Sequence, residues 1–286
     1  MLTLLAPAKI NLVLEVLGKC DDGYHEICSL VQTISLCDVL SFGLAEGISL
    51  ECTEPSLQTS DNLVIRSAKL LREAIGCQKG AKIRLEKRIP WGAGLGGGSS
   101  DAATTLLALN KLWELELAIS DLVELAAKLG SDVPFFIHKG TAVVECRGEK
   151  VTPLSAPLPR WFILLLPPLP KVPYKTQQLY ARLDNQHFTE GQFVSKALET
   201  WSQNREIDSS LLFNVFDKIA LVAFPGLEDY WKGFEEAGAA DIHLVGSGPA
   251  LFTPVGSETG AEELHHRLCQ QGFEAYPVST IVPQVV

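Results

Sequence analysis

A glycine-rich segment, Pro90-Trp-Gly-Ala-Gly-Leu-Gly-Gly-Gly-Ser-Ser-Asp101, carries the most specific chemical signal in the chain. Five glycines fall within seven residues, and an apolar run with helical spacing, 102–112, follows them. Glycines have no Cβ, so an anion can approach their N–H groups closely. The start of a helix adds unpaired N–H groups and the positive end of the helix dipole. This combination is typical of a phosphate-binding loop.

The identity of the loop can be narrowed by comparison with known phosphate-binding motifs. A P-loop requires a lysine directly after its last glycine, and no lysine follows these glycines. Gly92, Gly94 and Gly97 match the spacing of a dinucleotide-binding fold, but the strand expected before them, 81–89, alternates apolar and charged residues. A dinucleotide-binding fold needs a buried, apolar parallel strand at that place. Two interpretations remain: a nucleoside-triphosphate loop of another kind, or a flexible glycine turn with a serine cap.

Two groups of polar residues near the N-terminus could share a site with the loop. Lys9 and Asn11 alternate with apolar residues, which places them on one face of a strand, either solvated or functional. Further along, Asp22-Gly marks a turn. Tyr24 and His25 after it are either ordinary turn residues or an aromatic platform for a nucleotide base.

Two further groups lie later in the chain. Ser131 and Asp132 stand between two expected helices, where either could be an N-cap. A carboxylate at that place could instead accept a proton from a substrate hydroxyl. The turn Gly246-Ser-Gly248 separates two apolar strands and is either a plain hairpin turn or part of the site.

The elements that must position these residues form two groups. The first group is expected to contain strands at 10–17, 24–42 (one or two), 48–52, 81–89 and 141–146, with helices at 61–76, 102–112 and 120–130. The proline-rich stretch 153–159 marks the expected domain boundary. The second group should contain strands at 161–166 and 274–279, a hairpin-like strand pair around 246–248, and helices at 176–183, up to 237, and at 258–269.

Composition excludes several classes of protein. The 286 residues carry a net charge of −10, which argues against a nucleic-acid-binding protein. No apolar run approaches the length of a membrane span, and the N-terminus lacks the features of a signal peptide, so we expect a cytoplasmic protein. The seven cysteines are scattered and form no C-x-x-C, which predicts reduced thiols and no zinc site. His265 and His266 point about 100° apart on a helix, which argues against a shared metal site.

In chain order, the motifs resemble those of the GHMP kinases. The three signature motifs correspond to Pro7-Ala-Lys-Ile-Asn11, the loop Pro90–Ala102 and the turn Val245-Gly-Ser-Gly-Pro-Ala250. Asp22-Gly-Tyr-His25, Ser60-Asp-Asn-Leu63 and Gly130-Ser-Asp-Val-Pro134 resemble the branch of the family that acts on a cytidine-diphosphate-linked methylerythritol. The segment Val172-Pro-Tyr-Lys-Thr-Gln-Gln-Leu-Tyr180 departs from the Ser-Thr pattern of that branch.

The resemblance implies a role for each matching residue. Asp132 would be the catalytic base and Lys9 its partner. Substrate binding would fall to Asn11, Tyr24, His25, Thr176, Tyr180, Gly246 and Ser247, with Tyr24 stacking on cytosine and His25 reading its edge. ATP binding would fall to Asn62, Lys87, Pro90, Gly92, Gly94, Leu95, Gly96, Gly97, Gly98, Ser99 and Ser100. Mg²⁺ is implied with ATP, and its ligands are unknown, with Ser99, Ser100 and Asp101 as candidates.

The fold implied by the resemblance is α+β, with two domains and the active site in the cleft between them. An N-terminal ATP-binding domain, 1–157, would be of the ribosomal-protein-S5-like domain 2 type, and a C-terminal domain, 158–286, ferredoxin-like. The implied reaction is ATP-dependent phosphorylation of the 2-hydroxyl of the methylerythritol in the non-mevalonate isoprenoid pathway, by a monomer or weak homodimer without nucleic-acid or membrane partners. The alternatives are a GHMP kinase acting on mevalonate-type substrates or homoserine, and a silent nucleotide or metabolite sensor.

Overall fold

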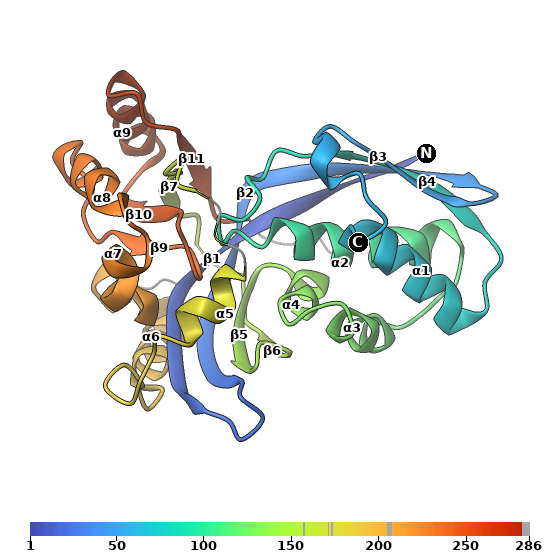
Figure 1. Ribbon diagram of the computed structural model, residues 1–286, viewed down its shortest axis with the longest axis horizontal. Coiled ribbons are helices and arrows are strands. Elements are labelled where there is room, and N and C mark those ends of the chain that lie inside the picture. Colours follow the sequence, from blue (N-terminus) through green and yellow to red (C-terminus); the bar gives the residue numbers. More distant parts are fainter. Residues whose placement is uncertain (157, 171, 173, 205–207, 282–286) are drawn as a thin grey trace.

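Two long antiparallel strands form the centre of the sheet in the first half of the molecule. The computed structural model describes residues 1–156, 158–170, 172, 174–204 and 208–281 (Figure 1). Strand β1 (Leu2–Lys19) begins eight residues before the expected strand, and β2 (His25–Ala45) is a single strand. Their pairing shifts register between Pro7 and Ala8 and again between Asn11 and Val13. Such irregularities bend a strand pair and re-aim its side chains next to functional sites.

The first sheet has seven strands and is mixed. Its order is β3-β4-β2-β1-β8, with β5 paired to β2 and β6 to β5. The added strands are β3 (Ile48–Cys52), β4 (Gly80–Glu86), β5 (Thr141–Cys146), β6 (Lys150–Pro153) and β8 (Phe213–Asn214). Strand β4 runs antiparallel to β2 and parallel to β3, and its burial alternates. This confirms a half-exposed strand in a mixed sheet before the glycine loop.

Four helices cover one side of this sheet (Figure 1): α1 (Leu63–Ile75), α2 (Gly97–Leu112), α3 (Ile119–Ala127) and α4 (Val133–His138). Between them and the sheet lies an apolar core that includes Phe42, Leu106, Trp113 and Phe136. Helix α2 begins five residues before the expected start, because the last two glycines and both serines of the loop already have helical backbone. This start brings the glycines into the first turn, where N–H groups are unpaired.

The second half forms a smaller antiparallel sheet in the order β11-β7-β10-β9. Its strands are β7 (Trp161–Leu165), β9 (His243–Leu244), β10 (Leu251–Val255) and β11 (Ala275–Ser279). Between β7 and β9 lie α5 (Lys175–Tyr180), α6 (Gln192–Asn204), α7 (Ala220–Ala223) and α8 (Leu227–Glu236), and α9 (Glu258–Gln270) connects β10 to β11. This β-α-β-β-α-β order is ferredoxin-like, and the fold class α+β is confirmed.

The two halves are joined by more than their covalent link. Strand β8 comes from the second half but pairs in parallel with β1 of the first sheet, and Thr280 forms a single bridge with Ile34. All seven cysteines are free thiols. Within the ranges that the structure describes, no helix is long and apolar enough to cross a membrane.

A buried group of charges fixes both ends of the glycine loop. Asp38 of β2 is fully buried, and its Oδ1 accepts the backbone N–H groups of Arg88 (2.6 Å) and Ile89 (2.8 Å), where the loop begins. The Lys87 ammonium pairs with Asp38 and, at 3.0 Å, with Asp101 in the first turn of α2, where the loop ends. Asp38, Lys87 and Asp101, called here the loop triad, therefore hold the loop between a strand and a helix.

The loop triad contains two carboxyl groups and one ammonium group. Burial alone would lower the pKa of Lys87, but the carboxylates of Asp101 and Asp38 raise it above its usual value. Burial, helped by the charge of Asp38, raises the pKa of Asp101 to about 8. The Oδ1 atom of Asp101 is buried without a hydrogen-bond partner. The raised pKa favours the protonated form of Asp101, which would bring the triad close to electrical neutrality.

We expect Asp38→Ala to lower the free energy of unfolding by about 3 kcal/mol or more. The change leaves the Lys87 ammonium and two N–H groups buried without their acceptor, and breaking a buried pair costs about 3–5 kcal/mol. Urea denaturation of the full chain measures the loss. As the control, Glu51→Gln breaks the exposed pair with Lys82 and should leave the transition unchanged. Equal urea midpoints for the two variants would contradict the anchoring role.

We expect Asp101→Asn to weaken the pH dependence of stability. A carboxyl group whose pKa is raised on folding binds more protons in the folded state than in the unfolded state. The free energy of unfolding then falls as pH rises from about 4 toward about 8. Asparagine has no proton to lose, so the variant should gain stability relative to the parent between pH 5 and 9. Urea titrations across this range test this, and a constant difference would argue against a protonated Asp101.

Candidate functional site

The glycine loop has a backbone that ordinary residues rarely adopt. Gly92, Gly94 and Gly96 have φ angles of 81°, 93° and 72°, in the left-handed region that favours glycine. Gly96 is the N-cap of α2 and provides no side chain to cap it. The interpretation of the loop as a turn with a serine cap is therefore wrong. The free N–H groups at the start of α2 remain available to an anion.

Close packing, besides backbone conformation, requires glycine at three positions. A Cβ on Gly94 would overlap the carbonyl oxygen of Val245 in the turn of the second half. A Cβ on Gly96 would lie 2.7 Å from the ring of Phe136. A Cβ on Gly246 would lie 2.8 Å from the Lys9 ammonium nitrogen. Lys9, the glycine loop and the turn of the second half are thus packed closely against one another.

Lys9 is buried at the centre of this meeting point. Only 6% of its surface is exposed, and its backbone N–H donates to the Leu95 carbonyl at 3.0 Å. Its ammonium donates to Asn11 Oδ1 at 2.6 Å, and the Asn11 amide donates in turn to Ser29 Oγ at 2.8 Å. Burial lowers the pKa of Lys9, and the carboxylate of Asp132 opposes that effect. The interpretation of this strand face as solvated is therefore wrong.

Asp132 occupies the N-cap position of α4 but makes no capping hydrogen bond. The interpretation of this residue as a helix cap is therefore not supported by its contacts. Its side chain lines the same cavity as Lys9. The carboxylate is free to accept a proton there.

The cavity around Lys9, called here the Lys9 cavity, has a volume of about 430 Å³. It brings together most of the predicted site residues. Those that line it are Lys9, Asn11, Pro90, Gly92, Gly94, Leu95, Gly96, Gly97, Gly98, Ser99, Asp132, Thr176, Tyr180, Gly246 and Ser247. Thr176 Oγ1 and Ser247 Oγ are 3.0 Å apart and link α5 to the turn of the second sheet. Gly246 and Ser247 of this turn therefore border the Lys9 cavity, and their role in the site stays a prediction.

Aromatic residues stand beside the Lys9 cavity. The ring centroid of His25 lies 5.0 Å from that of Tyr180, and burial, with the charge of Lys19, lowers the pKa of His25. A neutral imidazole can both donate and accept hydrogen bonds, as reading of a base edge requires. Tyr24 is 59% exposed at the tip of the β1–β2 hairpin, and the Arg147 guanidinium lies 4.6 Å over its ring.

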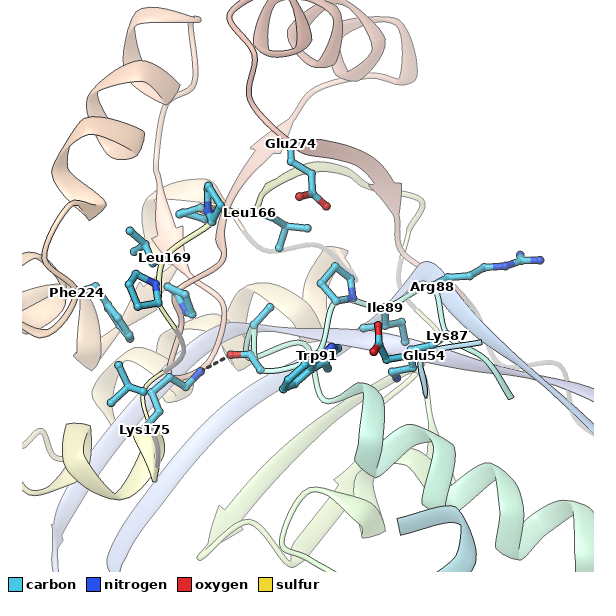
Figure 2. Close-up of a pocket in the computed structure, with 18 of the residues that line it drawn as sticks. Glu54, Lys87, Arg88, Ile89, Trp91, Leu166, Leu169, Lys175, Phe224 and Glu274 are labelled. Carbon is cyan, nitrogen blue, oxygen red and sulfur yellow. Dashed lines mark hydrogen bonds between the residues drawn. The ribbon is translucent and has the colours of Figure 1, made fainter. Parts of the chain in front are cut away.

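A second cavity, called here the Trp91 cavity, lies between the two halves of the molecule and measures about 560 Å³ (Figure 2). It shares Lys175 and the loop residues 90–93 with the Lys9 cavity. Its walls are mainly apolar, with Leu166, Leu169 and Phe224 facing Ile89 and Trp91. Two cavities thus meet at the glycine loop.

Three predicted ATP-binding residues do not line the Lys9 cavity. Asn62 caps α1, with its Oδ1 accepting the Val64 N–H at 2.9 Å, and it lines neither cavity. Lys87 borders the Trp91 cavity, but its ammonium belongs to the loop triad. Ser100 is fully buried, and its hydroxyl has no hydrogen-bond partner.

Sequence reasoning missed two side chains that shape the site. Asp38 carries no local signal, because its partners lie about 50 residues away along the chain. Lys175 donates hydrogen bonds to the carbonyls of Gly92, at 3.0 Å, and Gly248. The sequence signal that could have indicated Lys175 is the departure of the segment 172–180 from the Ser-Thr pattern.

This arrangement is suited to moving a phosphoryl group onto a hydroxyl. Phosphoryl transfer asks a protein chiefly for positioning and for stabilisation of negative charge. The start of α2 and the Lys9 ammonium supply the charge stabilisation. Asp132 supplies a proton acceptor in the same cavity.

Comparison with known proteins agrees with this chemistry. Residues 62–140 match the GHMP kinase N-terminal domain, and residues 194–274 match the GHMP kinase C-terminal domain. A 4-diphosphocytidyl-2-C-methyl-D-erythritol kinase of Dehalococcoides mccartyi is 47% identical over 283 residues, which is 99% of each chain. The enzyme of the same name from Thermodesulfovibrio yellowstonii is 39% identical over 268 residues, covering 92% of this chain and 93% of that one.

Solved structures extend the comparison. A 4-(cytidine 5'-diphospho)-2C-methyl-D-erythritol kinase superposes with a TM-score of 0.84 at 33% identity, covering 99% of this chain and 100% of its own. The mevalonate kinase of Methanococcus jannaschii superposes with a TM-score of 0.72 at 15% identity over 98% of each chain, which shows a shared fold. With both family domains matched and full-length relatives far above 30% identity, the chain belongs to the GHMP kinases.

Proposed function

We propose that the protein transfers the γ-phosphoryl group of ATP to the 2-hydroxyl of 4-diphosphocytidyl-2-C-methyl-D-erythritol, giving the 2-phosphate and ADP, in the non-mevalonate isoprenoid pathway. The names of its full-length relatives support this substrate. The single observation that carries the chemistry is the position of Lys9, Asp132 and the glycine loop around one cavity.

The two adjoining cavities suit the two nucleotides of this reaction. We assign the ATP phosphates to the loop and the start of α2, and its base to the Trp91 cavity, whose apolar walls would pack against a purine. The cytidine part of the other substrate would then extend from the Lys9 cavity toward His25 and Tyr180. Tyr24, at the open tip of its hairpin, would stack on cytosine once the substrate is bound.

Each residue has a defined part in the proposed step. The substrate oxygen forms a bond to the γ-phosphorus while the bond from that phosphorus to the β–γ bridging oxygen breaks. The proton of the hydroxyl passes to Asp132, and ADP leaves with the electron pair of the broken bond. Lys9 lies beside this transfer and offsets the negative charge of the phosphate. Asn11 holds the Lys9 ammonium in place.

A magnesium ion fits the oxygen ligands of the Lys9 cavity. Mg²⁺ is usually held by phosphate oxygens, waters and one or two carboxylates. Ser99 and Asp132 line the cavity, whereas Asp101 is paired with Lys87 within the loop triad. Ser99 would therefore contribute a ligand beside phosphate oxygens and waters, which leaves Asp132 free to act as the base, and the ion would neutralise charge on the phosphates. The protein would act in the cytoplasm as a monomer or weak homodimer.

The aromatic residues distinguish this function from its alternatives. Mevalonate and homoserine carry no base, so a kinase for either has no use for the His25–Tyr180 pair beside the cavity. A silent sensor has no use for a free carboxylate beside a buried lysine. Both observations favour the cytidine-linked substrate.

We expect ADP release with 4-diphosphocytidyl-2-C-methyl-D-erythritol, and none above background with mevalonate or homoserine. A coupled spectrophotometric assay with ATP and Mg²⁺ measures the three rates in parallel. Turnover of one of the other alcohols alone would move the protein to another branch of the family. If no alcohol reacts but ATP binds, the protein is a sensor.

We expect Asp132→Asn and Asp132→Ala to reduce kcat by about 10²–10⁴-fold, the range typical of a lost general base. Binding of ADP should change little, because the phosphates are assigned to the loop. The same assay gives kcat, and isothermal titration gives the Kd of ADP. As the control, Asp241→Asn removes an exposed carboxylate of the second half and should keep full activity. Near-normal turnover in both Asp132 variants would exclude this residue as the base.

A further inference from the structure

Lys175 is a side chain of the second half that reaches across to the glycine loop of the first (Figure 2). It lies at the start of α5 and is half-buried. Its ammonium donates to the carbonyl oxygens of Gly92 in the loop and Gly248 in the opposite turn. It lines both the Lys9 cavity and the Trp91 cavity. The side chain therefore stands where the two proposed nucleotide sites meet.

The charge around Lys175 is not balanced by its contacts. Both of its acceptors are neutral carbonyl oxygens, and the acceptor for Lys9 is the neutral Asn11 amide oxygen. Asp132 is the carboxylate that lines the Lys9 cavity with these two ammonium groups. Burial, with the nearby charge of Lys9, lowers the pKa of Lys175 to about 8. Among the described residues that line the Lys9 cavity, two ammonium groups and one carboxylate leave a surplus positive charge, and such a site attracts an anion.

We propose that Lys175 binds the phosphate groups of a nucleotide held in the cleft, exchanging its glycine carbonyl acceptors for phosphate oxygens. The inference rests on the proposed function, because it assumes nucleotides in the two cavities. The shared chemistry is a nucleoside diphosphate or triphosphate, which either ATP or the cytidine-linked substrate provides. A hydrogen bond to a charged group is worth more than one to a neutral carbonyl, so the exchange favours binding.

A purely structural role makes a different prediction. If Lys175 only tied the loop to the turn, its loss would disturb both cavities and weaken nucleosides and nucleotides alike. If it binds phosphate, its loss weakens only ligands that carry phosphates. Comparison of a nucleoside with its diphosphate therefore separates the two roles.

The test measures Kd by isothermal titration at pH 7 for adenosine, ADP, cytidine and CDP with the full chain. In Lys175→Met, the affinity for ADP, for CDP or for both should fall by about 10-fold or more, with both nucleosides unchanged; a charge-assisted hydrogen bond accounts for this size. The diphosphate that loses affinity identifies which nucleotide Lys175 contacts. Lys175→Arg keeps the charge and should stay within about 3-fold of the parent.

The control is Lys111→Met, which removes an exposed charge at the far end of α2 and should leave all four affinities unchanged. Equal losses for nucleoside and diphosphate, or no loss for either diphosphate, would overturn the proposal. The measurement requires no turnover. A parent protein that binds both diphosphates but phosphorylates no alcohol would refute the proposed function and leave the assignment of Lys175 intact.

Discussion

The site depends on the close approach of three backbone segments around one buried ammonium group. Lys9 comes from β1, Gly96 from the loop and Gly246 from the turn of the second sheet. A Cβ added at Gly96 would lie 2.7 Å from the nearest side-chain atom, and one added at Gly246 would lie 2.8 Å from its own nearest side-chain atom. At Gly96 the neighbour is the ring of Phe136, and at Gly246 it is the end of the Lys9 side chain. Both glycines also have positive φ angles, of 72° and 56°, so backbone conformation and packing together favour glycine at these positions. The same packing places the loop glycines along the wall of the Lys9 cavity.

Burial of charge next to the loop requires compensation, and the chain solves the problem in two ways. In the loop triad, the Lys87 ammonium is paired with carboxyl groups, and the raised pKa of Asp101 lets a proton take up the excess negative charge. On the cavity side, Lys9 and Lys175 have neutral acceptors. The paired cation holds the loop in position, and the two others leave charge available for a ligand. Lys87 thus stabilises the position of the loop, whereas Lys9 and Lys175 are the lysines that could bind a ligand.

Much of this arrangement could be predicted from the sequence because its signals are local. Helix α1 ends at Gly76 in a left-handed conformation, within the expected range 61–76. The mixed sheet was predictable from the charged alternation of β4. The start of α2 was not, because consecutive glycines disfavour a helix until neighbouring groups such as the Lys87 ammonium pack against them. Asp38 and Lys175 contact partners distant in the chain, and only the folded topology brings these together.

The topology also explains why one loop lines two cavities. Residues 90–93 form a partition whose two faces line different cavities, and hydrogen bonds from Ala250 to Ala93 and from Lys175 to Gly92 connect that partition to the second half. Because both cavities share these residues, a displacement of the partition alters the lining of both. Because close-packed segments rearrange as units rather than deform continuously, a ligand in either cavity constrains the position of the loop for both. A kinase that must place a phosphate donor and a hydroxyl acceptor in line has reason to build both sites on a single shared segment.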